Sequence, residues 1–266
     1  MNLSDALLLG LVQGITEFLP VSSTAHLRVV PALLGWGDPG AALTAVLQLG
    51  SLVAVIGFFL RDLIAMARAA LRPDRGTNPD ARRLLYLIVG TVPVGIAGLT
   101  FRHAIEGPLR SLTVIGVALI VVALLMAAAD KFAAGERDVA DLTMRDALLV
   151  GLAQALALVP GVSRSGITLV AGMALGLRRD AAARFSFLLS VPAIGAAGVF
   201  ELPKVLHAGL SAPVLAAGLL TAAVSGYLSI AWLLRFLRTR ATTPFVVYRV
   251  ALGLLLIGGA AAGYLH

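Results

Sequence analysis

Residues 13–26, QGITEFLPVSSTAH, place a carboxylate, three consecutive hydroxyl side chains and an imidazole within a largely apolar stretch. In chain order, these groups belong to Glu17, Ser22, Ser23, Thr24 and His26. A hydroxyl becomes a nucleophile when a base lies beside it, and a neighbouring carboxylate holds an imidazole in one tautomer and makes it a better base. The stretch therefore has the groups for nucleophilic chemistry, with Ser23 and Thr24 as candidate nucleophiles. The other hydroxyls are expected to cap the helix that follows.

A second stretch, residues 160–166 with the sequence PGVSRSG, carries the opposite charge. It places Arg164 between Ser163 and Ser165, with a glycine on each side. Backbone N–H groups at such a break bind anions, and a guanidinium adds bidentate hydrogen bonds to a phosphate or carboxylate. The stretch therefore predicts a site for one of these anions.

Each of these groups also has a purely structural interpretation. Arg164 could extend to a membrane interface, and His26 could be a hydrogen-bonded core histidine. Glu17 could form a buried ion pair with Arg164. Ionisable groups at membrane depth are costly and by default mark functional sites, which favours the chemical interpretation.

The composition places both stretches in a membrane protein. Of the 266 residues, 59% are hydrophobic and 13% are charged, whereas a soluble domain has about 25% charged residues. The apolar runs are too long for barrel strands and lack their alternation, so the sequence predicts an all-α polytopic membrane protein with one integral membrane domain, residues 1–266.

The basic residues lie in short loops, where they set topology, so the net charge of +7 does not indicate a nucleic-acid partner. The lack of cysteine excludes disulfides and thiolate chemistry, and no cleaved signal peptide is expected.

Two apolar segments are interrupted by the polar stretches and are too short to cross a membrane twice. Residues 3–36 and 146–176 are each expected to form a re-entrant helical hairpin, whose backbone must be buried in protein or line a wet cavity. A basic loop is expected at residues 61–83 and a charged linker at residues 131–145. Six full spans are expected at residues 41–60, 84–100, 111–130, 184–200, 213–234 and 246–265.

The two hairpins are related by a sequence repeat. Residues 5–22 align without gaps to residues 146–163 at an offset of 141, and nine of the 18 positions are identical. Each half then holds one hairpin and three spans, and because three is odd the halves insert in opposite orientations. The sequence therefore predicts an inverted-topology repeat of residues 1–130 and 146–266, with a site where the halves meet.

The distribution of basic residues predicts the orientation. With the 61–83 loop placed in the cytoplasm, cytoplasmic segments carry 15 Lys and Arg residues and the opposite side carries four. Both termini are then outside and the hairpins enter from opposite faces, so their tips meet and bring residues 13–26 near Arg164. Tyr248 and Arg249 open the last span and are expected to anchor it at the interface.

The polar stretches resemble the two signature segments of the bacterial undecaprenyl-diphosphatase family of the bacitracin-resistance type. QGITEFLPVSSTAH is similar to the first signature and PGVSRSGIT to the second, and the segments LQLGSLVAV, FSFLLSVP and PF–YR also look familial. The resemblance covers essentially the whole chain. Gln13 is a variable point, because many members have Glu at this position.

The resemblance implies hydrolysis of undecaprenyl diphosphate to undecaprenyl phosphate and inorganic phosphate, which recycles the lipid carrier of peptidoglycan synthesis and confers bacitracin resistance. It implies a multi-pass protein of the bacterial cytoplasmic (inner) membrane, with its active site open to the periplasmic or outer face. The implied partners are the bilayer and a polyprenyl diphosphate lipid, and the implied cofactor is a divalent cation, Mg²⁺ or Ca²⁺. Whether the chain forms a homo-oligomer is left open.

For this chemistry we expect Ser23 as the nucleophile and His26 as its base and then its acid. Glu17 is expected to orient His26 or to hold the metal ion; attack by His26 itself, or by water, is the alternative. The residues expected to bind phosphate are Arg164, Ser163, Ser165, Ser22 and Thr24, with Gln13 and Thr168 in support. The competing function is a secondary transporter or flippase of an anionic lipid phosphate, which shares the architecture but needs no nucleophile.

Overall fold

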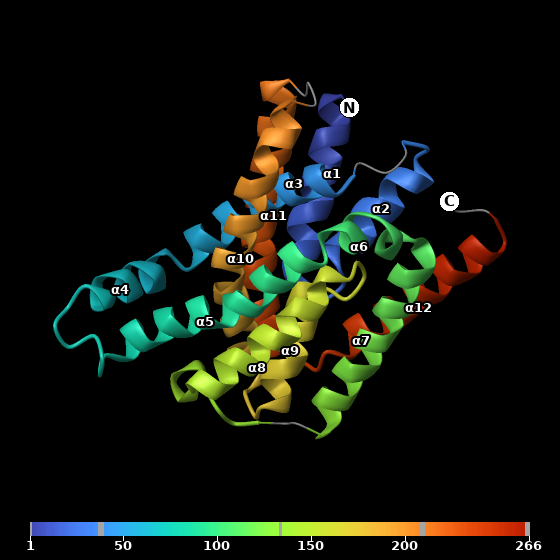
Figure 1. Ribbon diagram of the computed structural model, residues 1–266. Coiled ribbons are helices and arrows are strands. Elements are labelled where there is room, and N and C mark those ends of the chain that lie inside the picture. The colour runs from blue at the N-terminus through green and yellow to red at the C-terminus, as the bar shows by residue number, and fades with distance from the viewer. Residues whose placement is uncertain (1, 37–39, 133–134, 208–210, 264–266) are drawn as a thin grey trace.

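The computed structural model describes residues 2–36, 40–132, 135–207 and 211–263, and their secondary structure is helical apart from one isolated β-bridge between Arg137 and Leu177 (Figure 1). Five of these helices are long and apolar enough to cross a membrane, which confirms an all-α polytopic membrane protein. The five are α5 (Pro79–Thr100), α7 (Leu112–Phe132), the Arg179–Phe200 part of α10 (Arg179–His207), α11 (Ala212–Leu237) and α12 (Thr243–Ala261). The other elements are α1 (Leu3–Phe18), α2 (Ser23–Leu33), α3 (Gly40–Phe58), α4 (Leu60–Ala70), α6 (Arg102–Glu106), η1 (Pro108–Arg110), η2 (Val139–Asp141), α8 (Met144–Ala155), η3 (Leu156–Leu158) and α9 (Arg164–Ala174).

The helix expected at residues 41–60 is present as α3, and the chain bends sharply where this helix ends. Segments Val46–Phe58 and Leu60–Ala70 meet at 76°, and the number of spans reaches six only if this bent pair is one span. Both carboxylate oxygens of Asp62 accept from Arg184 Nη2, each at 2.7 Å. The Arg184 guanidinium also lies 5.1 Å from the ring centre of Phe59. An ion pair and a cation–π contact therefore fix the start of α4 against α10.

The expectation that residues 61–83 form a loop is wrong for the part that becomes α4. Its apolar residues recur at helical spacing, so that Met66 and Ala69 are buried while Arg61 and Arg68 are exposed. This is the pattern of an amphipathic helix that lies along a surface. In Figure 1, α4 projects away from the other helices beside the start of α5.

Two pairs of short helices meet near the centre of the molecule. Figure 1 shows α1 and α8 approaching the centre from opposite ends, and α2 and α9 lead the chain back out. Ser22 (φ 75°) and Ser163 (φ 70°) cap α2 and α9, and they are the non-glycine residues with positive φ in the described part of the chain. Such a conformation costs about 1–3 kcal/mol at each residue, so the surrounding structure must enforce it twice.

The first helix of each pair packs on a long helix of the other half of the chain. Helix α1 contacts α11, and helix α8 contacts α5. A Cβ on Gly10 would lie 2.3 Å from the carbonyl oxygen of Gly218, and a Cβ on Gly151 would lie 2.3 Å from that of Gly90. Only glycine permits this close approach of two backbones, which is typical of helix packing in membranes. The two halves therefore interlock.

Candidate active site

The carboxylate of Glu17 lies at the end of α1 and is almost fully buried. Its Oε2 atom accepts hydrogen bonds from Ser23 Oγ at 2.6 Å and from Gln13 Nε2 at 2.9 Å. Gln13 lies four residues, about one helical turn, before Glu17, and its Nε2 also donates to Ser51 Oγ at 3.3 Å. Gln13 therefore supports Glu17, and Ser51 of α3 is a support that sequence reasoning missed.

Two turns connect the short helices: residues 19–22 between α1 and α2, and residues 159–163 between η3 and α9. Arg164 joins these two turns. Its Nη2 donates to Glu17 Oε1 at 3.1 Å, and the exposed fraction of the two side chains is 12% and 4%. Its Nη1 donates to the carbonyl oxygen of Ser186 at 3.2 Å. Thr168 donates to the Arg164 carbonyl at 2.7 Å and shares a 2.6 Å hydrogen bond with the Ser186 hydroxyl. The expected proximity of Glu17 and Arg164 is thus an ion pair, with Thr168 in a supporting position.

Most of the expected phosphate-binding hydroxyls are occupied by structural hydrogen bonds. Ser22 and Ser163 accept from the backbone N–H groups of the third residue beyond each of them, at 3.4 Å and 3.1 Å, and so cap α2 and α9. Thr24 accepts from the Gly161 N–H at 3.4 Å, and Ser165 donates to the Leu19 carbonyl at 3.1 Å. These two side chains fasten one turn to the other. Among the expected hydroxyls, the one at Ser23 is the one that donates to a carboxylate.

His26 is held by partners other than the expected carboxylate. Its Nδ1 lies 2.7 Å from the Ser22 carbonyl oxygen and its Nε2 lies 2.6 Å from Tyr248 Oη. The two rings are nearly parallel, at an angle of 7°. Both ring nitrogens are therefore occupied, and the expectation that Glu17 orients His26 is wrong, because the backbone of the turn and a tyrosine of α12 do so instead.

Arg249 is fully buried, which corrects its expected role as an interfacial anchor. Its Nη1 donates to the Pro20 carbonyl at 3.1 Å, and its Nη2 donates to the carbonyls of Gly161 and Val162 at 2.9 Å and 3.0 Å. Its Nε donates to the Leu119 carbonyl of α7 at 3.1 Å. A buried guanidinium needs such hydrogen bonds to be tolerated. Arg249 thereby ties both turns and α7 to α12.

The sequence matches the family model described as bacitracin resistance protein BacA over residues 6–255. The chain belongs to the BacA family. It is 54% identical over 263 residues to an undecaprenyl-diphosphatase of Myxococcus xanthus, covering 97% of this chain and 89% of that protein. It is 50% identical over 276 residues to the undecaprenyl-diphosphatase of Synechococcus elongatus, covering 100% and 96% of the two chains, and 49% identical over 257 residues to that of a Nocardioides species, covering 94% and 93%.

Two residues of this BacA-family site lay outside the sequence-based set. Tyr248 and Arg249 are separated from the first turn by more than 200 residues, since the His26–Tyr248 bond spans 222 positions. The available signal was an arginine inside an apolar span, which by its cost indicates a buried functional or structural group. The signal for the tyrosine was its place in the PF–YR segment, which resembles the family.

The residues of the site offer an incomplete set of metal ligands. Oxygen atoms suit Mg²⁺ and Ca²⁺, and Gln13 Oε1 is buried without a hydrogen-bond partner in the described part of the chain, one turn from Glu17. The described part of the chain also holds no group of three or more His, Asp or Glu side chains that could bind a metal ion. The donor set therefore fits a cation that takes its remaining ligands from a bound phosphate.

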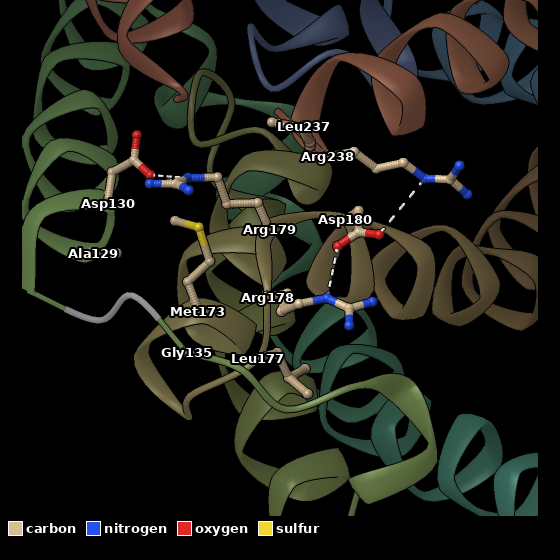
Figure 2. A pocket seen from close by; sticks show the side chains of 10 residues that line it. All are labelled: Ala129, Asp130, Gly135, Met173, Leu177, Arg178, Arg179, Asp180, Leu237 and Arg238. Atoms are coloured by element: carbon tan, nitrogen blue, oxygen red, sulfur yellow. Dashed lines mark hydrogen bonds and ion pairs between the residues drawn. The ribbon is translucent and has the colours of Figure 1, made fainter. Parts of the chain in front are cut away.

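A separate cavity of about 450 Å³ lies between the ends of α7, α9, α10 and α11 (Figure 2). Its arginines face aspartates: Arg179 pairs with Asp130, and Asp180 pairs with Arg178 at 3.3 Å and with Arg238 at 3.8 Å. The residues that line this cavity include no hydroxyl, whereas the turns bring the Ser23 hydroxyl beside Glu17 and Arg164. The turns are therefore the candidate active site of this BacA-family protein.

Proposed function

We propose that the protein hydrolyses undecaprenyl diphosphate to undecaprenyl phosphate and inorganic phosphate, and so recycles the lipid carrier of peptidoglycan synthesis and confers bacitracin resistance. The reaction cleaves a phosphoric anhydride. The observation that carries the proposal is the 2.6 Å hydrogen bond from Ser23 to a buried carboxylate that is paired with Arg164. In a chain of the BacA family, this arrangement supplies a nucleophile, a proton acceptor and an anion-binding cation at one point.

The first step is attack by Ser23 Oγ on the terminal phosphorus. The Ser23 proton passes to Glu17 Oε2, an O–P bond forms, and the bond to the bridging oxygen breaks to release undecaprenyl phosphate. Arg164 turns from Glu17 to the phosphate, so Glu17 is left free to accept the proton. The second step is attack by water on the resulting phosphoserine, which releases inorganic phosphate while Glu17 returns its proton to Ser23 Oγ.

The phosphates are held by backbone groups as well as by Arg164. Helices α2 and α9 both begin at the junction of the turns, and their first N–H groups carry partial positive charge. Ser22, Thr24, Ser163 and Ser165 contribute by fixing these helix ends, because their hydroxyls are already bonded there. Phosphoryl transfer depends mainly on positioning and charge stabilisation, which this arrangement provides.

We assign the divalent cation, Mg²⁺ or Ca²⁺, to the oxygen atoms of Gln13 and Glu17 together with the substrate's own phosphates. Its contribution when bound is to neutralise charge on the diphosphate. The orphaned Gln13 Oε1 supports this assignment.

We further propose that the chain is an inverted-topology repeat whose two short-helix pairs are re-entrant hairpins, in the cytoplasmic membrane of a bacterium with the site open to the outer face. The twin cap residues Ser22 and Ser163, at the repeat offset of 141, support the repeat. The excess of basic residues on one side supports the orientation. The polyprenyl tail then stays in lipid while the diphosphate enters between the turns.

Release of inorganic phosphate from a polyprenyl diphosphate in detergent micelles tests the function. The wild-type chain should release phosphate, and the Ser23→Ala variant should release none above background. A secondary transporter or flippase would release none from either chain, so that outcome would replace the enzyme with the competing function.

A further inference from the structure

The two hydrogen bonds of the His26 ring fix its protonation in the resting site. A carbonyl oxygen only accepts, so Nδ1 must donate to the Ser22 carbonyl, at 2.7 Å. In the neutral ring Nε2 then carries the lone pair, and it accepts from the Tyr248 hydroxyl at 2.6 Å. His26 is therefore a base whose one available lone pair is covered by Tyr248.

The nucleophile does not use this base directly. Ser23 and His26 lie three residues apart on the same side of α2, but the Ser23 hydroxyl donates to Glu17. The hydroxyl of Tyr248 is thus the group through which a proton from the site can reach His26. Tyr248 is 45% exposed, whereas Glu17 is 5% exposed, so the tyrosine is also the less buried of the two.

We propose, on the basis of the function given above, that Tyr248 and His26 form a proton relay for the hydrolysis of phospho-Ser23. As the attacking water oxygen bonds to phosphorus, one water proton passes to Tyr248 Oη and the Tyr248 proton passes to His26 Nε2. The bond from phosphorus to Ser23 Oγ breaks, and Oγ takes the proton held by Glu17. The imidazolium then returns its proton through Tyr248 to the departing phosphate or to water, which restores the resting state.

The relay is tested by Tyr248→Phe, which keeps the ring beside His26 and removes only the hydroxyl. The matched control is Tyr227→Phe, because Tyr227 is 46% exposed, also lies in a long helix, and contacts Phe58 through its ring. With a polyprenyl diphosphate labelled in its terminal phosphate, we expect Tyr248→Phe to slow turnover by about 10²-fold and to accumulate phosphoserine at position 23. The control should do neither. Combining Tyr248→Phe with His26→Gln should add little to either single loss, since the two act in series.

Several results would overturn the relay. Turnover of Tyr248→Phe at or above the wild-type rate would mean that the tyrosine merely covers His26. A slow variant without phosphoserine would place Tyr248 in the first step, and additive losses would make the two residues independent. Release of no phosphate by the wild-type chain would instead overturn the function on which the relay depends.

Two further measurements separate a relay from a loss of folding. In a chain whose other histidines (His103, His207 and His266) are replaced by Gln, the ¹⁵N resonances of His26 should show the Nδ1–H tautomer, with the Nε2 signal moving in Tyr248→Phe. Replacing Tyr248 with a fluorinated tyrosine keeps the hydroxyl and makes it more acidic. The pH–rate profile of phosphoserine breakdown should then shift to lower pH, and an unchanged profile would contradict proton transfer through Tyr248.

Discussion

Glu17 and Arg164 stand 147 positions apart in the sequence and meet in a buried ion pair of 3.1 Å between the two turns. The same carboxylate accepts from Ser23, so one pair of side chains links the nucleophile to the anion-binding group. Removing one partner of a buried pair leaves the other uncompensated, whereas removing both does not. A comparison of single and double replacements of this pair therefore separates its effect on stability from its effect on catalysis.

Arg164→Ala should lower the free energy of unfolding by about 3 kcal/mol and turnover by about 10³-fold, because it leaves Glu17 unpaired and the phosphate unbound. Adding Glu17→Gln to this variant should recover much of the stability and none of the activity. Thermal unfolding in detergent and phosphate release measure the two effects. Recovery of activity in the double variant would mean that Arg164 serves only to neutralise Glu17.

Ser23→Ala should abolish turnover and leave stability nearly unchanged, since its hydroxyl bonds to Glu17 rather than to a helix end. The matched change is Ser22→Ala, which removes the cap of α2 and should cost about 1 kcal/mol while part of the activity remains. Mass spectrometry of a slow variant given substrate should find phosphate on Ser23. Phosphate on His26 instead would make the imidazole the nucleophile.

Arg249→Met should lower stability by about 3 kcal/mol or more, because it leaves the carbonyls of Pro20, Gly161 and Val162 without their donor. Activity should fall with it, since both turns lose their common support. Arg235→Met, at an exposed position of α11, is the control and should unfold at the wild-type temperature. Equal unfolding temperatures for the two variants would show that Arg249 does not hold the turns.

Asp146→Asn should reduce stability at neutral pH and remove one source of acid sensitivity. Burial raises the pKa of Asp146, but hydrogen bonds from Arg137 at 2.6 Å and from Thr143 outweigh it, so the pKa lies below its usual value. A carboxyl whose folded pKa is lowered contributes its full stability above its unfolded pKa of about 3.9 and loses it as the pH falls through the folded value. Unfolding followed between neutral pH and pH ~3 should therefore give wild-type and variant curves that converge at low pH. Parallel curves would show that Asp146 does not cause the loss of stability at low pH.

Gln13→Leu should weaken cation binding in the presence of a non-hydrolysable diphosphate, because it removes the buried, unpartnered Oε1 of a side chain that is bonded to Glu17. Calorimetric titration with Mg²⁺ should show an affinity about tenfold lower than that of the wild-type chain. Gln13→Glu, which places a second carboxylate beside Glu17, should bind Mg²⁺ more tightly. Identical affinities in all three chains would place the cation elsewhere.

The sequence by itself determined the class of protein and most of the reactive groups. The long apolar runs required helices in a membrane, and the polar stretches around Glu17 and Arg164 marked the site because ionisable groups are costly at that depth. The repeat at an offset of 141 related Ser22 to Ser163, and both cap a helix with the same strained backbone. These features are runs of residues or a fixed spacing along the chain, so they can be identified from the amino-acid sequence alone.

Tertiary structure decided which groups touch. The sequence predicted that Glu17 lies near Arg164 and orients His26, nine positions away. In the folded chain Glu17 does pair with Arg164, but its other oxygen accepts from Ser23, and His26 is bonded to Tyr248 instead. Arg249, which the sequence predicted to be an anchor at the membrane interface, is instead fully buried and links the turns. Hydrogen-bond partners are set by the packing of helices that are distant in sequence, and no periodicity or composition within one segment specifies which distant carbonyl or hydroxyl a side chain will reach.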